Sequence, residues 1–233
     1  MARPVQDRTE AILAAARAQF RLDGAEHTTV DAVAARAGVG KGTVFLYWPT
    51  KARLRDAVLQ LETAKLMAVL ADDLRTGATH LSVGRVVRRE ILAVLENPDL
   101  ASHVVGPFSP SSKPEQFPGR PLHRIITTMQ AHGLVRDAAI NEIVAGFETV
   151  MKGSLAIGFA EPERMEALLD AAERLLDSTY TRADAGPAAV AAALPEVLDA
   201  LEDAIDQLVE AAAPDRPTTA VLRPRERPAV AEA

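Results

Sequence analysis

The histidines, serines and carboxylates of this 233-residue chain form no recognisable catalytic or metal-binding pattern. The chain has no cysteine, and none of its five histidines lies three or four residues from another, the spacing that puts two imidazoles on one helix face. Ser109, Ser111 and Ser112 stand in a Pro-rich stretch without an oriented base nearby. We therefore expect no metal site, no cofactor and no enzymatic activity.

Another set of polar groups stands in residues 28–51, which read TTVDAVAARAGVGKGTVFLYWPTK. Lys41 falls at the predicted start of a short helix, where free backbone amides and the helix dipole favour an anion. Val44 and Trp48 are four residues apart and can face inward together. The opposite face is then small, hydroxylated or aromatic and carries no acidic residue: Gly42, Thr43, Phe45 and Leu46. Such a face could approach a DNA groove closely.

Helical periodicity defines the elements that position these groups. Apolar residues recur every three or four positions and strand-like alternation is nearly absent, which predicts an all-α fold. Gly24, Gly38 and Pro49 separate the first four helices, and Pro195 could kink the last. The expected helices cover residues 7–22, 30–37, 41–48, 51–75, 82–97, 98–105, 120–132, 137–159, 162–180 and 186–213. Residues 106–121 are expected to form a loop.

Charge divides the chain unevenly. The net charge is −6, which by itself argues weakly against a nucleic-acid partner. Residues 1–56, however, hold nine Lys and Arg against six Asp and Glu, so they carry +3 and the remainder carries −9. We expect a helix-turn-helix domain at residues 1–50, a larger helical domain at 51–213 and a disordered tail at 214–233.

No apolar run of about 18 residues is present and the N-terminus is not apolar, which predicts a cytoplasmic protein without a membrane partner.

The segment around these helices resembles the DNA-binding region of the TetR/AcrR family of transcriptional regulators. The resemblance is carried by Thr29-Val30-Asp31-Ala32-Val33-Ala34, Ala37-Gly38-Val39, Lys41-Gly42-Thr43 and Tyr47-Trp48-Pro49-Thr50-Lys51. It implies an α-helical protein with an N-terminal three-helix DNA-binding domain and a C-terminal ligand-binding and dimerisation domain. It also implies a repressor that binds a palindromic operator as a homodimer and is released by a small molecule.

The resemblance also assigns DNA contacts to individual residues. Lys41, Gly42, Thr43 and Phe45 would contact bases or the nearby backbone, whereas Thr29, Tyr47 and Lys51 would hold phosphates. A tyrosine hydroxyl and a lysine ammonium suit phosphate oxygens. The segment departs from the family pattern at Gly40, which removes a common serine hydroxyl, and also at Phe45, Leu46 and Trp48. These departures bear on which operator is read.

The larger domain offers weaker signals. Bulky or polar residues that could line a ligand cavity, although core packing explains each as well, are Met67, His103, Phe108, His123, Met129, Phe147 and Met151. Two stripes could pair helices across a dimer, with packing inside one chain as the alternative. One is the small-residue stripe with Gly146, Thr149 and Gly153, and the other contains Leu201 and Ile205. Two other classes stay open: a helical ligand-binding protein without operator recognition, and a small α-helical enzyme.

Overall fold

A computed structural model describes residues 5–77, 81–96 and 121–215. The predicted helix at 98–105, the predicted tail from 216 onward, and the candidate ligand residues His103 and Phe108 lie outside the described residues. The described part is all-α, as the periodicity predicts. Its one extended pairing is an isolated bridge between Val135 and Thr181.

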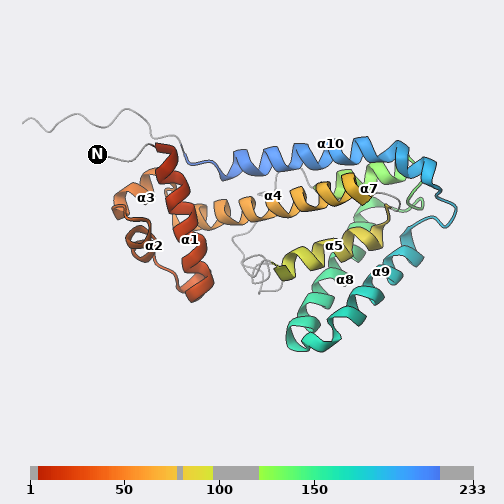
Figure 1. Cartoon of the computed structure of the whole chain (residues 1–233), viewed down its shortest axis with the longest axis horizontal. Coiled ribbons are helices and arrows are strands. Elements are labelled where there is room, and N and C mark those ends of the chain that lie inside the picture. Colours follow the sequence, from red (N-terminus) through yellow and green to blue (C-terminus); the bar gives the residue numbers. More distant parts are fainter. Residues whose placement is uncertain (1–4, 78–80, 97–120, 216–233) are drawn as a thin grey trace, which may run out of the picture.

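The N-terminal helices form a small separate unit, here called the head, at the left of Figure 1. It consists of α1 (Val5–His27), α2 (Val30–Ala37), α3 (Lys41–Tyr47) and the first turns of α4 (Lys51–Gly77). Apolar side chains from all four helices close its core, among them Ile12, Val33, Val44, Trp48 and Leu54. The inward positions expected for Val44 and Trp48 are therefore confirmed, since these side chains are 1% and 0% exposed.

Two glycines set the turns of the head. Gly24 leaves helical geometry with φ 76°, so the last residues of α1 turn away from its axis. Gly38 ends α2 in the left-handed region with φ 67°, a conformation that side chains disfavour, and the N–H of Val39 bonds the carbonyl of Ala34. Both glycines thus stand at the breaks that the sequence predicts.

The remaining helices form a larger unit, here called the body. They are α5 (Val83–Glu96), α7 (Pro121–Ala131), α8 (Ile140–Ala160), the 3₁₀ turn η2 (Pro162–Arg164), α9 (Met165–Tyr180) and α10 (Pro187–Ala212). Helix α10 continues through Pro195 without a break in the helix. Pro195 and Ala191 are both exposed, and water can satisfy the carbonyl that proline leaves without an intrahelical partner.

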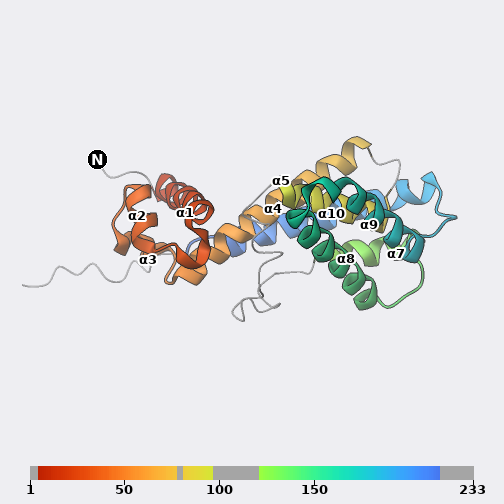
Figure 2. The same cartoon turned by 90° about the horizontal axis from the view of Figure 1, so that it is seen from below.

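Two long helices join the head to the body. Helix α4 runs from the head into the body, and α10 returns beside it toward the head in both views (Figures 1 and 2). Along α4, Leu54, Ala57 and Val58 belong to the core of the head, whereas the buried apolar residues from Leu59 onward belong to that of the body. The core of the head thus reaches beyond the boundary that we placed after residue 50.

Helices α5, α8 and α9 form the lower lobe of the body in Figure 1. Helix α8 is long and apolar enough to cross a membrane by length and composition, with a mean hydropathy of 1.3 in its best window. It packs against α5, α7 and α9, and Phe147 and Leu155 are fully buried in the core of the body. In that window 33% of the residues are buried, so α8 packs on the body along one side only.

Candidate nucleic-acid interface

Helix α2 begins at the surface of the head, where Thr29 is its N-cap. Thr29 is exposed and its Oγ1 accepts a hydrogen bond from the N–H of Ala32 at 3.2 Å, so Thr29 caps α2. Thr28 has a different task, because its buried hydroxyl donates to the carbonyls of Gln19 and Gly24. The side chain of Thr29 is therefore in place to meet a phosphate, although its oxygen already accepts one bond.

The outward face of α3 is open and mostly apolar. Gly42 is exposed, and a Cβ added there would meet nothing within 4 Å. Phe45 and Leu46 are 37% and 53% exposed, which is unusual for large apolar side chains, while Thr43 is half-buried. The N-cap Gly40 makes no side-chain hydrogen bond, so the start of α3 leaves backbone amides free for an anion. This face combines close approach, apolar contact and free amides.

Lys41 is not a free cation in this structure. Its Nζ lies 2.7 Å from Oδ2 of Asp31, which comes from the first turn of α2, and both side chains are largely exposed. The face of α3 itself carries no acidic residue, as expected, but this carboxylate of α2 lies beside it. Helical spacing within α3 could not reveal the carboxylate because it comes from the neighbouring helix. A phosphate or base that Lys41 contacts must compete with Asp31.

Tyr47 lies in a different environment from the one expected for a phosphate contact. The residue is 3% exposed and belongs to the core of the head, with its ring 6.0 Å from that of Trp48. Its backbone carbonyl accepts a hydrogen bond from the N–H of Asp215 at 2.9 Å. The aromatic ring thus serves the packing of the small core, and a phosphate contact by the hydroxyl stays a prediction.

Lys51 has a structural partner as well. Its Nζ donates to the backbone carbonyl of Glu26 at 2.6 Å, near the end of α1, and the side chain is half-buried. An ammonium has three donors, so this bond leaves two for a phosphate. Thr50 caps α4 by accepting from the N–H of Arg53 at 3.1 Å, as its sequence position predicts.

The residues that sequence reasoning missed are those at the end of α10. Ala212 is 2% exposed and part of the core of the head, and its carbonyl accepts from Nε1 of Trp48 at 3.4 Å. Arg53 donates to the carbonyl of Ala211 and pairs with Asp215 at 3.4 Å. About 160 residues separate the partners along the chain, and no local signal could have connected them.

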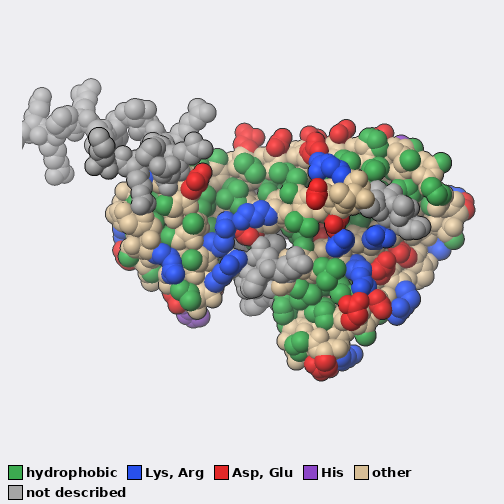
Figure 3. Space-filling view, in the orientation of Figure 1, with side chains coloured by type: hydrophobic (Ala, Val, Ile, Leu, Met, Phe, Trp, Pro, Cys, Tyr) green, Lys and Arg blue, Asp and Glu red, His purple; other side chains and the backbone are tan. Residues whose placement is uncertain are grey.

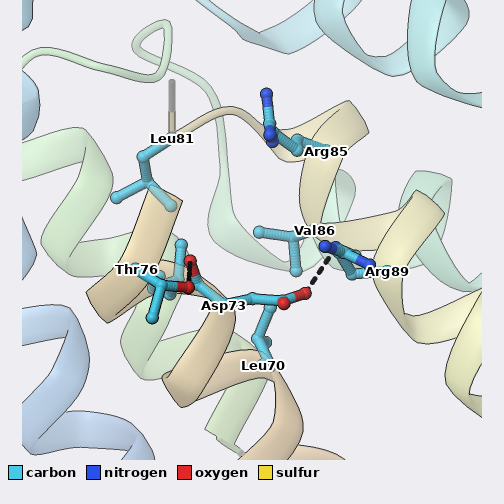
Figure 4. A pocket seen from close by; sticks show the side chains of 8 residues that line it. Leu70, Asp73, Thr76, Leu81, Arg85, Val86 and Arg89 are labelled. Atoms are coloured by element: carbon cyan, nitrogen blue, oxygen red, sulfur yellow. Dashed lines mark hydrogen bonds and ion pairs between the residues drawn. The ribbon is translucent and has the colours of Figure 1, made fainter. Parts of the chain in front are cut away.

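The candidate ligand residues do not gather around a described cavity. Met67, Met129 and Phe147 are buried in the core of the body, Met151 packs against it and His123 is half-buried on α7. A pocket of about 100 Å³ instead lies between the end of α4 and the start of α5, where Asp73 pairs with Arg89 at 2.5 Å (Figure 4). A surface depression of about 360 Å³ lies beside the end of α7. None of the candidate residues lines either, and their role as a ligand wall stays a prediction.

The candidate dimer residues divide into two groups. A Cβ on Gly146 would lie 2.7 Å from Oη of Tyr180, Leu201 is fully buried, and Ile205 packs against the core of the body. Leu201 therefore serves packing within the chain. Gly146 and Ile205 are only partly buried, so their place in a dimer surface stays a prediction. Thr149 and Gly153 are exposed on α8, and a Cβ on Gly153 would meet nothing within 4 Å.

Comparison with known proteins agrees with this architecture. Residues 12–58 match the model for bacterial regulatory proteins of the tetR family. No curated protein matches the sequence significantly. A putative tetR family transcription regulator from Shewanella sp. PV-4 superposes with a TM-score of 0.56 at 19% identity, covering 75% of this chain and 98% of that one.

Two further solved structures share the fold. The transcriptional regulator FadR from Bacillus subtilis, in complex with stearoyl-CoA, has a TM-score of 0.58 at 16% identity and covers 72% of this chain and 96% of its own. TylP, a tetR regulator from Streptomyces fradiae, has a TM-score of 0.54 at 18% identity, and the match covers 78% of this chain and 90% of TylP. At these identities the likeness concerns the fold.

The helix-turn-helix head on an all-helical body defines a DNA-binding transcriptional regulator. Residues 12–58 match the model of the tetR family of bacterial regulatory proteins, and the fold is shared with tetR regulators of known structure.

Proposed function

We propose that the protein is a repressor that acts in the cytoplasm, binds a palindromic operator as a homodimer and is released by a small molecule. The tetR-family head, with the exposed face of α3 between Thr29 and Lys51, is the observation that carries the proposal. The charge distribution supports it, because residues 1–56 carry +3 on a chain with a net charge of −6.

The chemistry of α3 suggests how an operator would be read. The open backbone at Gly42 allows α3 to approach the floor of the major groove, and exposed Phe45 and Leu46 can contact thymine methyl groups. Lys41, once released from Asp31, can donate to guanine acceptors or to a phosphate. Lys51 and Thr29 would hold the phosphate backbone of the DNA on either side of α3. The face thus favours an operator with thymines at the centre of each half-site.

A homodimer would use the outward sides of α8 and α9. On α8 one exposed stripe is made of small residues, Ala145, Thr149, Gly153 and Ala156, and Ile157 beside it is 39% exposed. On the neighbouring α9, Ala171 is exposed and Leu175 is 54% exposed. Small residues let helices approach closely and exposed apolar ones supply area to bury. The apolar stripe of α10, by contrast, is already used against α4 and α7.

The effector would be a small molecule bound by the body, with FadR from Bacillus subtilis as a structural relative that holds stearoyl-CoA. The interior of the body is apolar, so an apolar portion of the molecule is the part that it can accept. Helix α4 contributes to both cores and can carry a shift in the body to the head. An effector can shift the equilibrium only if it binds the released arrangement more tightly.

Selection of bound DNA from a random library by the purified full chain tests the proposal. We expect a palindrome whose half-site centres lie about one helical turn, roughly 34 Å, or a multiple of it apart. Lys41→Ala should change the preferred bases, while Lys152→Ala, a matched lysine on α8, should leave them unchanged. Recovery of no preferred sequence would favour the helical ligand-binding protein without operator recognition, and turnover of a bound compound would favour an enzyme.

A further inference from the structure

The end of α10 is fastened to the head by polar contacts and by burial. The carbonyl of Ala211 accepts a hydrogen bond from the guanidinium of Arg53 at 3.4 Å, and that of Ala212 accepts from Nε1 of Trp48 at 3.4 Å. Ala212 is 2% exposed and belongs to the core of the head. We call this group of contacts the clasp, and it consists of Ala211, Ala212, Trp48 and Arg53.

The clasp supplies what the last turn of a helix lacks. The final carbonyls of an α-helix have no intrahelical partner and carry a partial negative charge. The N–H of Asp215 stands where it could bond the carbonyl of Ala211, but it donates instead to the carbonyl of Tyr47 at 2.9 Å. Donors of the head, one of them the cationic Arg53, take its place. The head itself therefore caps α10.

The position of the clasp decides what it can control. Trp48 is the C-cap of α3 and Arg53 lies in the first turn of α4, so the clasp holds the corner between these two helices. Helix α10 begins in the body and runs beside α4 (Figure 1). A head carried by α4 alone could move as that helix bends between the two cores. The clasp adds a second attachment and ties the direction of α3 to the body.

Helix α10 is poorly suited to touch DNA itself. Acidic side chains line its outer edge along the top of Figure 3, and exposed members of this edge include Glu202, Asp206 and Glu210. Phosphates would be repelled along this edge. An effect of the end of α10 on DNA binding must then act through the position of the head.

We propose that Trp48 and Arg53 are positioning residues, which through the clasp determine the half-site spacing that the homodimer accepts. The inference rests on the proposed binding of a palindromic operator by a homodimer. One added base pair moves two half-sites about 3.4 Å apart and turns them by about 35° around the duplex. A head held at two points fits one spacing, whereas a head held by α4 alone can follow several.

The fluorescence of Trp48, the single tryptophan of the chain, tests the clasp without DNA. A chain that stops after Glu210 lacks Ala211 and Ala212, whereas a chain that stops after Asp215 keeps every contact of the clasp. We expect acrylamide to quench Trp48 more strongly in the first chain and as in the full chain in the second. Circular dichroism checks that both are folded. Equal quenching in the two truncated chains would overturn the clasp.

A series of duplexes with the selected half-sites at different spacings tests the positioning role. The full chain should prefer one spacing at least about tenfold over those one base pair shorter or longer, and Arg53→Met or the stop after Glu210 should reduce this preference to about threefold or less. Arg75→Met, which removes an ion pair between α4 and Glu202 of α10 in the body, is the control, as is the stop after Asp215. Both controls should keep the preference of the full chain.

The ratio between spacings separates positioning from other losses. Weaker binding of Arg53→Met at all spacings, with the preference unchanged, would show that Arg53 contributes only stability or a phosphate contact, and would overturn the inference. Equal binding of all spacings by the full chain would overturn it too. A full chain that binds none of the duplexes would remove the proposed function as well, whereas failure of the inference alone would leave sequence-selective binding intact.

Discussion

At the residue scale, the ion pair between Lys41 and Asp31 changes the charge that α3 presents to DNA. The ion pair joins the first turns of α3 and α2, and both partners are exposed, so it contributes little to stability, roughly 0–1 kcal/mol. Its larger effect would be on DNA binding. The carboxylate of Asp31 would be repelled by nearby phosphates, and it also holds Lys41, which could otherwise neutralise a phosphate. The pair therefore weakens the interface that Lys41 would make.

Asp31→Asn should tighten DNA binding. The change frees Lys41 and removes one negative charge from the interface, so we expect binding to strengthen about threefold to tenfold at about 0.1 M salt and the salt slope to grow by about 1. Fluorescence anisotropy across a salt series measures both. Asp199→Asn, at an exposed position on α10, is the matched control. Equal affinity in wild type and Asp31→Asn would show that Lys41 stays away from the DNA.

Glu90 on α5 is the second residue whose state depends on its surroundings. It is 8% exposed, and burial together with the nearby carboxylate of Glu148 raises its pKa to about 7 from an ordinary value of 4.5. The folded protein therefore binds this proton more tightly than the unfolded chain does. As a result, the free energy of unfolding should fall as the pH rises from about 4.5 to about 7 and level off above that.

Glu90→Gln should remove this pH dependence and raise the free energy of unfolding at pH 8 by up to about 3 kcal/mol, since each pKa unit corresponds to about 1.4 kcal/mol. Urea denaturation at a series of pH values measures the change. Glu142→Gln, at an exposed position on α8, is the matched control and should leave the profile unaltered. A wild-type profile that is flat between pH 5 and 7 in this comparison would contradict the raised pKa.

At the scale of elements, glycines decide how closely the helices of the body approach one another. A Cβ on Gly84 of α5 would fall well within 3.0 Å of the carbonyl oxygen of Glu173, a backbone atom of α9 that cannot turn aside. The backbone N–H of Gly84 also donates to Asp177 at 2.8 Å. On α8, a Cβ on Gly153 would meet nothing within 4 Å. The same residue type thus serves packing on one helix and leaves a surface open on another.

Gly84→Ala and Gly153→Ala should therefore have opposite effects. The first forces α5 and α9 apart and should lower the free energy of unfolding by about 2 kcal/mol. In the isolated chain the second should raise it by up to about 1 kcal/mol, because alanine favours a helix more than glycine does, whereas in a dimer the added methyl group would press on the partner helix of the proposed α8–α9 surface. Thermal or urea denaturation of the two variants compares them directly. A loss of stability in Gly153→Ala would indicate that a partner helix approaches this position closely.

At the scale of the whole molecule, two antiparallel helices connect the head to the body. Helix α4 contributes to both cores, and the end of α10 is anchored to the head through Trp48 and Arg53. Two such connections resist bending of the head better than a single helix would. In a dimer, the distance between the two heads would then depend on how the bodies meet, which makes the dimer surface decisive for operator spacing.

Leu175→Arg and Val209→Arg test the proposed α8–α9 dimer surface against the exposed side of α10. Leu175 on α9 is 54% exposed and Val209 on α10 is 48% exposed, so either change should be tolerated by the isolated chain. We expect Leu175→Arg to yield a monomer, because it places a charge in the proposed α8–α9 surface, and Val209→Arg to remain a dimer. Sedimentation velocity measures the outcome. A monomeric Val209→Arg beside a dimeric Leu175→Arg would move the surface to α10.

The sequence by itself determined the helices of the described residues, the turn at Gly38 and the inward positions of Val44 and Trp48. All of these depend on spacing within about ten residues, where helical periodicity and glycine geometry act directly. The tertiary structure alone decided that Asp31 holds Lys41, that Tyr47 is buried, that Leu201 packs inside the chain and that α10 ends on the head. Each depends on which helices meet, and contacts between residues far apart in the chain leave no periodic signal in the sequence.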